Sequence, residues 1–505
     1  MSHLKRNLVA NFAGRGWSAL MGLAFIPLYI RFMGIEAYGL VGFFTTLQAV
    51  FTLFDLGLTT TLNRELARCS ALPDKTYEMR DLVRTLETLY WGLAVCIGTA
   101  VIALSPFIAH GWVKAETLPV SVVQQAVMLM GLVIAFQWPL GFYSGGLLGL
   151  QRQVLYNILN AGWFTLRFAG AVIVLRFVSP TVFAFFTWQV FASAISTFLT
   201  ASTLWHNLPT SRQLPRFRID VLRLVWRFAA GMGAISVTVL LLTQLDKIIL
   251  SKLLSLEKFG YYSLASTVAN GLTYLVGPVF MALFPNFSQR VALGDQTGLK
   301  DMYHRACQLM SVIILPAAVV VTLFAPEILL IWTRNLTTVE NTHTLVSLLV
   351  IGTALNGLMN LPYALQLAHG WTKLTFYTNV VSVIALIPLL IATTLRYGAI
   401  GAAVVWVVLN GGYVLIELQL MHRRLLPGEQ WRWYLEDVGL PLAATSLIAG
   451  LARWTIVEPS PVVMMLVSLV LVSLSALVAS AWVTPVTRQW IKRAVAGKRL
   501  LGVQI

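Results

Sequence analysis

The stretch TVLLLTQLDKII (238–249) places an acid and a base side by side in an otherwise apolar run. The residues from Ala229 to Thr243, just before this pair, carry no charge at all. Apolar runs of about 20 residues recur along the chain, which is the length that crosses roughly 30 Å of hydrocarbon as a helix. The sequence therefore predicts a polytopic membrane protein.

The composition supports the same class. Of the 505 residues, 58% are hydrophobic and 11% are charged, whereas soluble proteins are roughly 25% charged. The three cysteines lack metal-ligand spacing and are interpreted as apolar filler, so neither a metal site nor a disulfide is expected. No soluble fold of this size could bury so much apolar surface.

The hydropathy pattern predicts an all-α fold of about fourteen transmembrane helices. The expected spans are 8–33, 37–62, 84–109, 121–147, 154–176, 181–205, 228–251, 258–284, 306–331, 344–368, 374–395, 399–421, 438–456 and 461–484.

The charges predict the orientation. With the N-terminus inside, the inner segments hold 25 of the 36 Lys and Arg and the outer segments hold eight. Cytoplasmic loops carry such an excess, so both termini are expected in the cytoplasm. The net charge of +16 then reflects topology, and no nucleic-acid partner is expected.

A weak internal repeat appears when the sequence is shifted by 221 residues. Glu36 then falls on Glu257, Gly39 on Gly260, and Gly149 on Gly370. Paired repeats are typical of transporters, whose substrate site lies at the repeat interface. The expected organisation is an N-lobe (1–206), a basic cytoplasmic linker (207–227), a C-lobe (228–422), an extra helical hairpin (437–484) and a basic cytoplasmic tail (485–505).

The sequence contains neither a Walker A nor an HExxH motif, and the longest loops run to about 20 residues, too short for a catalytic domain. We expect no enzyme activity and no cofactor. Energy would come from an ion gradient, the membrane potential or the substrate gradient.

Ionisable residues inside spans are the best functional candidates, because hydrocarbon makes them costly. Arg15 and Asp55 are expected about 10 Å from the cytoplasmic ends of spans 1 and 2. The pair could lock the first hairpin as an ion pair, or form a gate or substrate contact at the cytoplasmic mouth. Both alternatives remain open from the sequence.

Arg167 is expected about 20 Å deep in span 5, with no acidic residue at that depth in spans 3 to 6. Such an arginine indicates a wet cavity that holds an anion, although a hydrogen-bonded packing role is the alternative. Polar residues that could line the same cavity include Asn160, Gln189 and Asn270, each of which could instead join helices. The clear ionisable residues inside the spans are three cations (Arg15, Arg167 and Lys247) and two acids (Asp55 and Asp246), a balance that favours an anionic substrate.

Asp246 and Lys247 are not expected to pair, since neighbouring residues project about 100° apart on a helix. Lys247 shares a face with Gln244 and is interpreted as an anchor that reaches the outer surface. Asp246 is interpreted as a gate or proton site at the lobe interface.

Two segments carry a resemblance to a known family. The segment MGIEAYGLVGFFTTLQAVFTLFDLGLTTTLNRELAR (33–68) resembles the second span of Wzx-type polysaccharide (O-antigen) flippases, and TQLDKIILSKLLSLEKFGYYSLA (243–265) resembles the start of their second lobe. The acidic residue and YG at the entry are Glu36, Tyr38 and Gly39, and the D-x-G near the exit is Asp55 and Gly57. GLQRQ (149–153) resembles their loop between spans 4 and 5. The resemblance covers spans 1–12.

The resemblance implies two six-helix bundles that alternate access. It also implies export of an undecaprenyl-pyrophosphate-linked oligosaccharide, such as an O-antigen or exopolysaccharide repeat unit, across the bacterial inner membrane. H⁺ or Na⁺ could be the coupling ion, and a polysaccharide polymerase and glycosyltransferases could be partners.

Two alternatives come from the same superfamily of multidrug, oligosaccharidyl-lipid and polysaccharide exporters. The extra hairpin is compatible with the function of a lipid II flippase, since that flippase also has fourteen spans. A cation-coupled multidrug antiporter is disfavoured, because drug extruders commonly place a carboxylate in span 1, where this chain has Arg15.

Overall fold

The computed structural model describes residues 3–55, 57–70, 76–210, 214–220, 243–455 and 462–488, with the backbone alone at 3–12, 15, 76 and 77. Across these residues the chain is helical and forms no β-strand apart from one isolated bridge between Lys114 and Ser255. The predicted all-α membrane fold is therefore confirmed.

Twelve helical segments in the described part of the chain are long and apolar enough to cross a membrane. One of them, Lys373–Leu425, has 53 residues, or about 80 Å of helix, more than twice the thickness of the hydrocarbon. It breaks at Gly398, whose φ of 60° and ψ of −143° are not helical, so it covers two predicted spans. The predicted span 228–251 lies largely outside the described residues, where only 243–253 is seen as helix. The count of fourteen stays a prediction.

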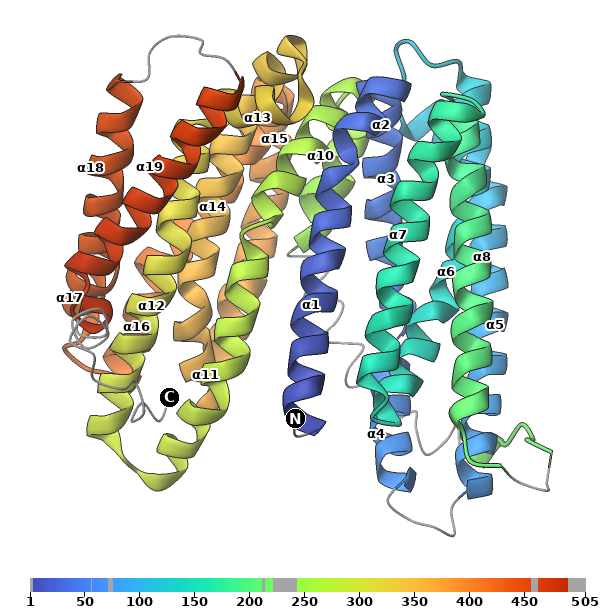
Figure 1. Cartoon of the computed structure of the whole chain (residues 1–505), viewed down its shortest axis with the longest axis horizontal. Coiled ribbons are helices and arrows are strands. Elements are labelled where there is room, and N and C mark those ends of the chain that lie inside the picture. The colour runs from blue at the N-terminus through green and yellow to red at the C-terminus, as the bar shows by residue number, and fades with distance from the viewer. Residues whose placement is uncertain are drawn as a thin grey trace. The chain divides into compact units, whose positions relative to one another are not determined.

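The chain divides into two compact units, residues 1–260 and residues 261–505 (Figure 1). The boundary falls inside α10. Unit 1 contains, in order, α1 (His3–Ala24), α2 (Ile26–Met33), α3 (Ile35–Phe51), the 3-10 turn η1 (Thr52–Asp55), α4 (Leu58–Ser70), α5 (Thr76–Phe107), the π-helical turn η3 (Ile108–Trp112), α6 (Val120–Gly149), α7 (Gln153–Phe177), α8 (Val182–Asn207) and the start of α10 (Leu256–Asn270).

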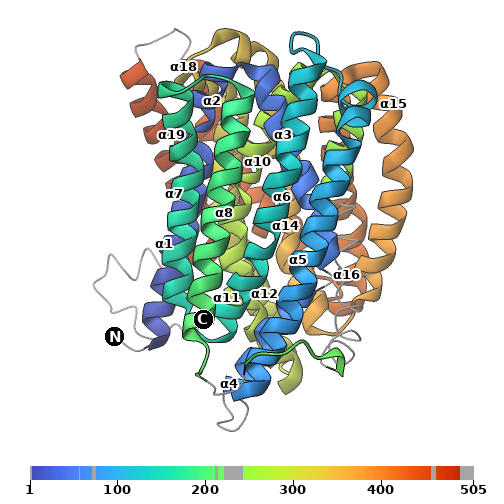
Figure 2. The same ribbon diagram turned by 90° about the vertical axis from the view of Figure 1, so that its right-hand side faces the viewer.

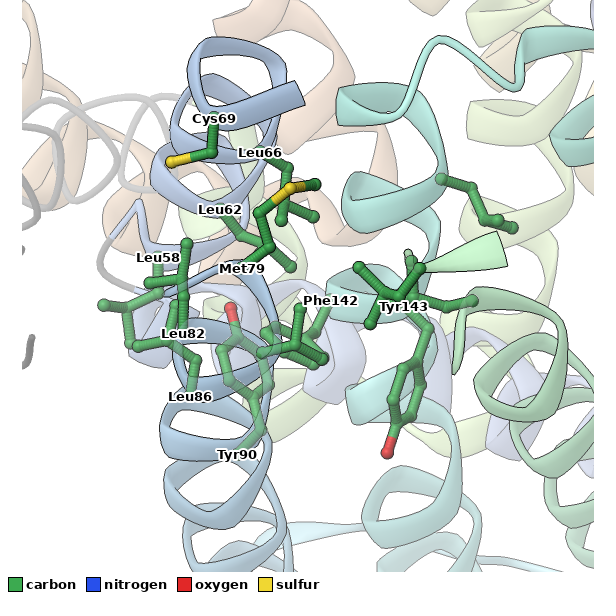
Figure 3. Packing of buried hydrophobic residues seen from close by; sticks show 14 residues of the cluster. Leu58, Leu62, Leu66, Cys69, Met79, Leu82, Leu86, Tyr90, Phe142 and Tyr143 are labelled. Carbon is green, nitrogen blue, oxygen red and sulfur yellow. The ribbon is translucent and has the colours of Figure 1, made fainter. Parts of the chain in front are cut away.

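In unit 1, α6 lies between α5 and α8 and also contacts α4 (Figure 2). An apolar cluster is buried where α4, α5 and α6 meet. Figure 3 shows Leu62 and Leu66 of α4 pointing toward Met79 of α5, with Phe142 and Tyr143 of α6 beside them. This cluster fixes the amphipathic helix α4 to the bundle.

The start of α3 is held by residues of the family-like motif. The buried Glu36 carboxylate accepts the backbone N–H groups of Glu116 and Thr117 at 2.5 and 3.0 Å. A Cβ at Gly39 would collide with the carbonyl oxygen of Leu256, and a Cβ at Gly260 would lie 2.5 Å from that of Ile35. Both contacts follow the 221-residue register. Close approach of two backbones thus requires glycine at both positions.

Unit 2 continues with α11 (Thr273–Leu293), α12 (Gln296–Leu323), α13 (Ala325–Thr333), α14 (Leu336–Ala368), α15 (Lys373–Gly412), η4 (Tyr413–Glu417), α16 (Leu418–Leu425), α17 (Gln430–Arg432), η5 (Trp433–Gly439), α18 (Leu440–Thr455) and α19 (Val462–Val483). The last two helices form the predicted extra hairpin.

The hairpin packs directly on α12 (Figure 1). Val320 and Phe324 form one side of a buried apolar cluster, and Ala449 of α18 with Val472 and Ala476 of α19 form the other. Arg453 of α18 also pairs with Glu327 of α13. The hairpin is therefore an integral part of unit 2.

Replacing Leu66 by Ala should destabilise the protein by about 2–4 kcal/mol, because it leaves a cavity in the α4–α5–α6 cluster. Leu104→Ala on α5 is the matched control, since Leu104 is 53% exposed whereas Leu66 is fully buried. The measurement is thermal unfolding of the purified protein in detergent. Equal unfolding midpoints for the two variants would contradict this account of the cluster.

Candidate functional site

The helix that carries the family-like residues Glu36, Tyr38 and Gly39 is interrupted near Asp55. Helix α3 ends at Phe51, η1 occupies Thr52–Asp55, and α4 begins at Leu58. Gly57 has a φ of 75°, a left-handed conformation that a side chain disfavours. The sequence predicted one continuous span over 37–62, and this prediction is wrong. The Asp-x-Gly pattern encodes a helix break, because Asp can cap the next helix and Gly can reverse the chain.

Unit 2 has an interruption at a similar place in its own repeat. Helix α10 ends at Asn270, and α11 begins at Thr273. In the 221-residue register the turn at 271–272 corresponds to residues 50–51. These two residues lie about one helical turn before Asp55 in unit 1. Interrupted helices at corresponding positions of two repeats point to the substrate site of a transporter. The predicted site residue Asn270 is exposed at this break.

Asp55 is held by two hydroxyl groups. Tyr90 of α5 donates to Oδ1, and so does Thr59 of α4 at 2.5 Å. The Thr59 backbone N–H points to the same oxygen at 3.4 Å, which caps the first turn of α4. Asp55 is half-buried, and the ring of Tyr90 stacks on Trp138 at 4.6 Å. The side chain of Arg15 lies outside the described residues, so the Arg15–Asp55 ion pair stays a prediction.

Arg167 lies among aromatic rings in unit 1. Its guanidinium carbon is 5.4 Å from the ring centroid of Trp163 and 5.6 Å from those of Phe44 and Phe168. Its Nε donates to Oε1 of Gln189 on α8 at 2.8 Å. None of the ion pairs seen among the described residues includes Arg167.

Asn160 donates to Ser18 Oγ at 3.2 Å and so joins α7 to α1. Its role in substrate binding stays a prediction. Gln244, Asp246 and Lys247 lie on the helical segment 243–253, and all three are half-buried. Their roles as gate, coupling site or anchor stay predictions.

The sequence analysis missed several buried acids, among them Glu87 and Glu417. Glu87 of α5 accepts from Tyr143 at 2.7 Å and from Trp205 at 3.0 Å, and it pairs with Arg84 at 3.0 Å. Glu417 accepts from Gln366 at 3.2 Å and from Thr375 at 3.0 Å. Both acids fall inside predicted spans, 84–109 and 399–421. The count of three intramembrane cations against two acids was therefore wrong, and the case for an anion depends on Arg167 alone.

Glu417 also borders a cavity of about 420 Å³ between the two halves of α15. Apart from Glu417, its polar lining residues are Tyr377, Thr378, Ser382 and Tyr413. The rest of the lining is apolar, so the cavity suits a hydrocarbon chain better than a charged group.

Comparison with known proteins places these features in context. A family model described as "Polysaccharide biosynthesis protein" matches residues 4–291, and a second model, MatE, matches residues 232–391. A relative from Shigella flexneri described as "Putative O-antigen transporter" is 23% identical over 401 residues, covering 79% of this chain and 93% of the relative.

Solved structures share the fold. The lipid II flippase MurJ in an inward closed conformation has a TM-score of 0.66 at 14% identity, covering 96% of this chain and 99% of that one. An inward-facing multidrug resistance MATE transporter of the MOP superfamily has a TM-score of 0.61 at 12% identity, covering 82% of this chain and 94% of that one. At these identities the similarity concerns the fold.

Tyr90→Phe should lower the free energy of unfolding by about 1.5–3 kcal/mol, since it removes a hydrogen bond to the Asp55 carboxylate. Tyr274→Phe, at a 55% exposed tyrosine, makes the same chemical change and should have little effect. Thermal unfolding in detergent measures both variants. A Tyr90→Phe protein as stable as the control would mean that the hydroxyl does not hold the helix break.

Proposed function

Because this chain belongs to the polysaccharide biosynthesis protein family, within the MOP superfamily of membrane flippases and transporters, we propose that it flips an anionic lipid-linked oligosaccharide. The substrate is an undecaprenyl-pyrophosphate-linked repeat unit of O-antigen or exopolysaccharide. The membrane is the bacterial inner membrane, with both termini in the cytoplasm, which agrees with the excess of Lys and Arg in the inner loops. The relative described as an O-antigen transporter supports this substrate class.

The observation that carries the proposal is the environment of Arg167. A guanidinium inside a membrane protein is costly unless it has a partner or lies in a wet cavity. Here the described partners are a neutral amide and three ring faces. A pyrophosphate or acidic sugar would supply the missing charge through bidentate hydrogen bonds, which suit the planar guanidinium. Arg15 would contribute a second cation on α1.

In this mechanism the two lobes rock about the substrate. Each unit would offer polar backbone at its own helix break, at Asp55 in unit 1 and at Asn270 in unit 2. Asp55 and Asp246 are the candidate gate or coupling residues, with H⁺ or Na⁺ as the ion. Binding shifts the equilibrium only to the extent that the substrate prefers one state.

Arg167→Ala should reduce export at least about tenfold, because it removes the charge that holds the anion. Arg167→Lys should retain part of the activity, since it keeps the positive charge but loses the planar guanidinium that donates two parallel hydrogen bonds. Surface glycan and inner-leaflet lipid-linked glycan would be measured in a deletion strain complemented with each variant, with protein abundance measured by immunoblot.

The matched control is Arg176→Ala, an exposed arginine at the end of the same helix, which should export normally. If Arg167→Ala lowers protein abundance and export together, Arg167 is a packing residue and the anion site is elsewhere. Full export by Arg167→Ala would also contradict the proposal.

Lipid II is the second candidate substrate. The fold similarity to the lipid II flippase covers 96% of this chain, so it includes most of the hairpin. We expect that this chain will not rescue cells depleted of their own lipid II flippase, because the sequence similarity is to a polysaccharide transporter. Growth of the depleted cells, measured by colony counts, would instead assign lipid II as the substrate.

A further inference from the structure

The helix break of unit 1 carries a group of amide and aromatic side chains. Gln48 of α3 donates to Oε1 of Gln137 on α6 at 2.5 Å. The indole of Trp138 donates to the carbonyl oxygen of Phe51 at 3.2 Å. The ring of Phe54 lies 6.0 Å from that of Phe51 and is 45% exposed. We refer to Gln48, Phe54 and Gln137 as the break face.

The two amides of the break face retain hydrogen-bonding capacity for a ligand. An amide side chain offers a carbonyl oxygen and an NH₂ group, and the bond between Gln48 and Gln137 uses one group of each. Within the described residues, Oε1 of Gln48 and Nε2 of Gln137 have no hydrogen-bond partner. Both side chains are half-buried, so a ligand can reach them.

The depth of the break face argues against contact with lipid. Gln48 lies thirteen residues after Ile35, where α3 starts, which is about 20 Å along the helix. This position is inside the roughly 30 Å of hydrocarbon. Polar side chains in lipid are costly and face the interior of a bundle or a water-filled space. The half-buried amides are therefore placed to meet water or substrate.

Unit 2 forms its own helix break without such side chains. The counterparts of the break face in the 221-residue register are small or aliphatic: Ala269 for Gln48, Leu275 for Phe54 and Leu358 for Gln137. Unit 2 is nevertheless interrupted between Asn270 and Thr273. A helix break thus forms with aliphatic residues at these positions, and the amides and ring of unit 1 serve another purpose.

The break face adjoins the proposed anion site along α3. The ring centroid of Phe44 lies 5.6 Å from the guanidinium carbon of Arg167. Gln48 follows Phe44 by four residues, so it lies about 6 Å further along the same side of the helix. A group bonded directly to an anion at Arg167 would therefore reach Gln48.

We propose that the break face binds a sugar ring of the lipid-linked glycan, next to the pyrophosphate. Sugar hydroxyls both donate and accept hydrogen bonds, as amide side chains do. The C–H face of a sugar ring is apolar and packs on an exposed aromatic ring such as that of Phe54. The break face is neutral, whereas an anion is bound better by a guanidinium. This inference rests on the proposed function, which supplies a glycan bonded to pyrophosphate.

Binding of two lipids to the purified protein in detergent separates the sugar contacts from the pyrophosphate contacts. The probes are the lipid-linked glycan extracted from the deletion strain and undecaprenyl pyrophosphate without sugar. The dissociation constant Kd of each is measured by microscale thermophoresis. The unmodified protein should bind the glycan-bearing lipid more tightly.

Gln48→Ala and Phe54→Leu should each weaken binding of the glycan-bearing lipid roughly three- to tenfold, because each removes one contact to the sugar. Neither should change the Kd of undecaprenyl pyrophosphate. Both substitutions introduce the residue that unit 2 has at the corresponding position, so the helix break should persist.

Arg167→Ala should weaken binding of both lipids alike, since both carry the pyrophosphate. Phe191→Leu is the matched control at a 59% exposed ring on α8 and should change neither Kd. If Gln48→Ala and Phe54→Leu bind the glycan-bearing lipid like the unmodified protein, or weaken both lipids equally, the break face does not bind sugar although the proposed function stands. An unmodified protein that binds neither lipid would contradict the proposed function, and the sugar site with it.

Discussion

An ionised side chain within hydrocarbon needs a partner supplied by the protein, and this requirement organises the buried charges of the molecule. Glu87 has an arginine, a tyrosine and a tryptophan, and Asp55 has two hydroxyls. The buried carboxyl group of Asp437 contacts His304 and Gln308. The described contacts of Arg167 are one amide oxygen and the faces of aromatic rings. These contacts supply no negative charge, and this is the physical basis of the proposed anion site.

The residues that carry the family resemblance fix the course and packing of the backbone. Glu36 binds two amide groups of a neighbouring loop, Gly39 admits a carbonyl oxygen, and Asp55 with Gly57 forms a helix break. These residues determine how the helices meet and where one is interrupted. They do not select a sugar. Family membership can therefore be assigned from the motif more firmly than the identity of the glycan.

Hydropathy predicted the helices well, because each span is a local run of apolar residues whose length matches the bilayer. The break at Asp55 was missed because a short turn barely alters a hydropathy window. The partner of Asp55, Tyr90, comes from another helix, and only the packing of α4 on α5 brings it close. The contact between His304 and Asp437 was missed for the same reason: Asp437 lies 133 residues further along the chain, and the two meet because the hairpin docks on α12.

The central claim is that this chain moves a pyrophosphate-linked glycan between leaflets. The most direct measurement uses the purified protein in liposomes that contain a labelled undecaprenyl-pyrophosphate oligosaccharide in both leaflets, with an impermeant glycosidase added outside. We predict that nearly all of the label becomes accessible in liposomes containing the protein, with an imposed proton or sodium gradient if the transport is coupled. In empty liposomes only the fraction in the outer leaflet should be cleaved. Cleavage limited to that fraction in both preparations, under every gradient, would contradict the account.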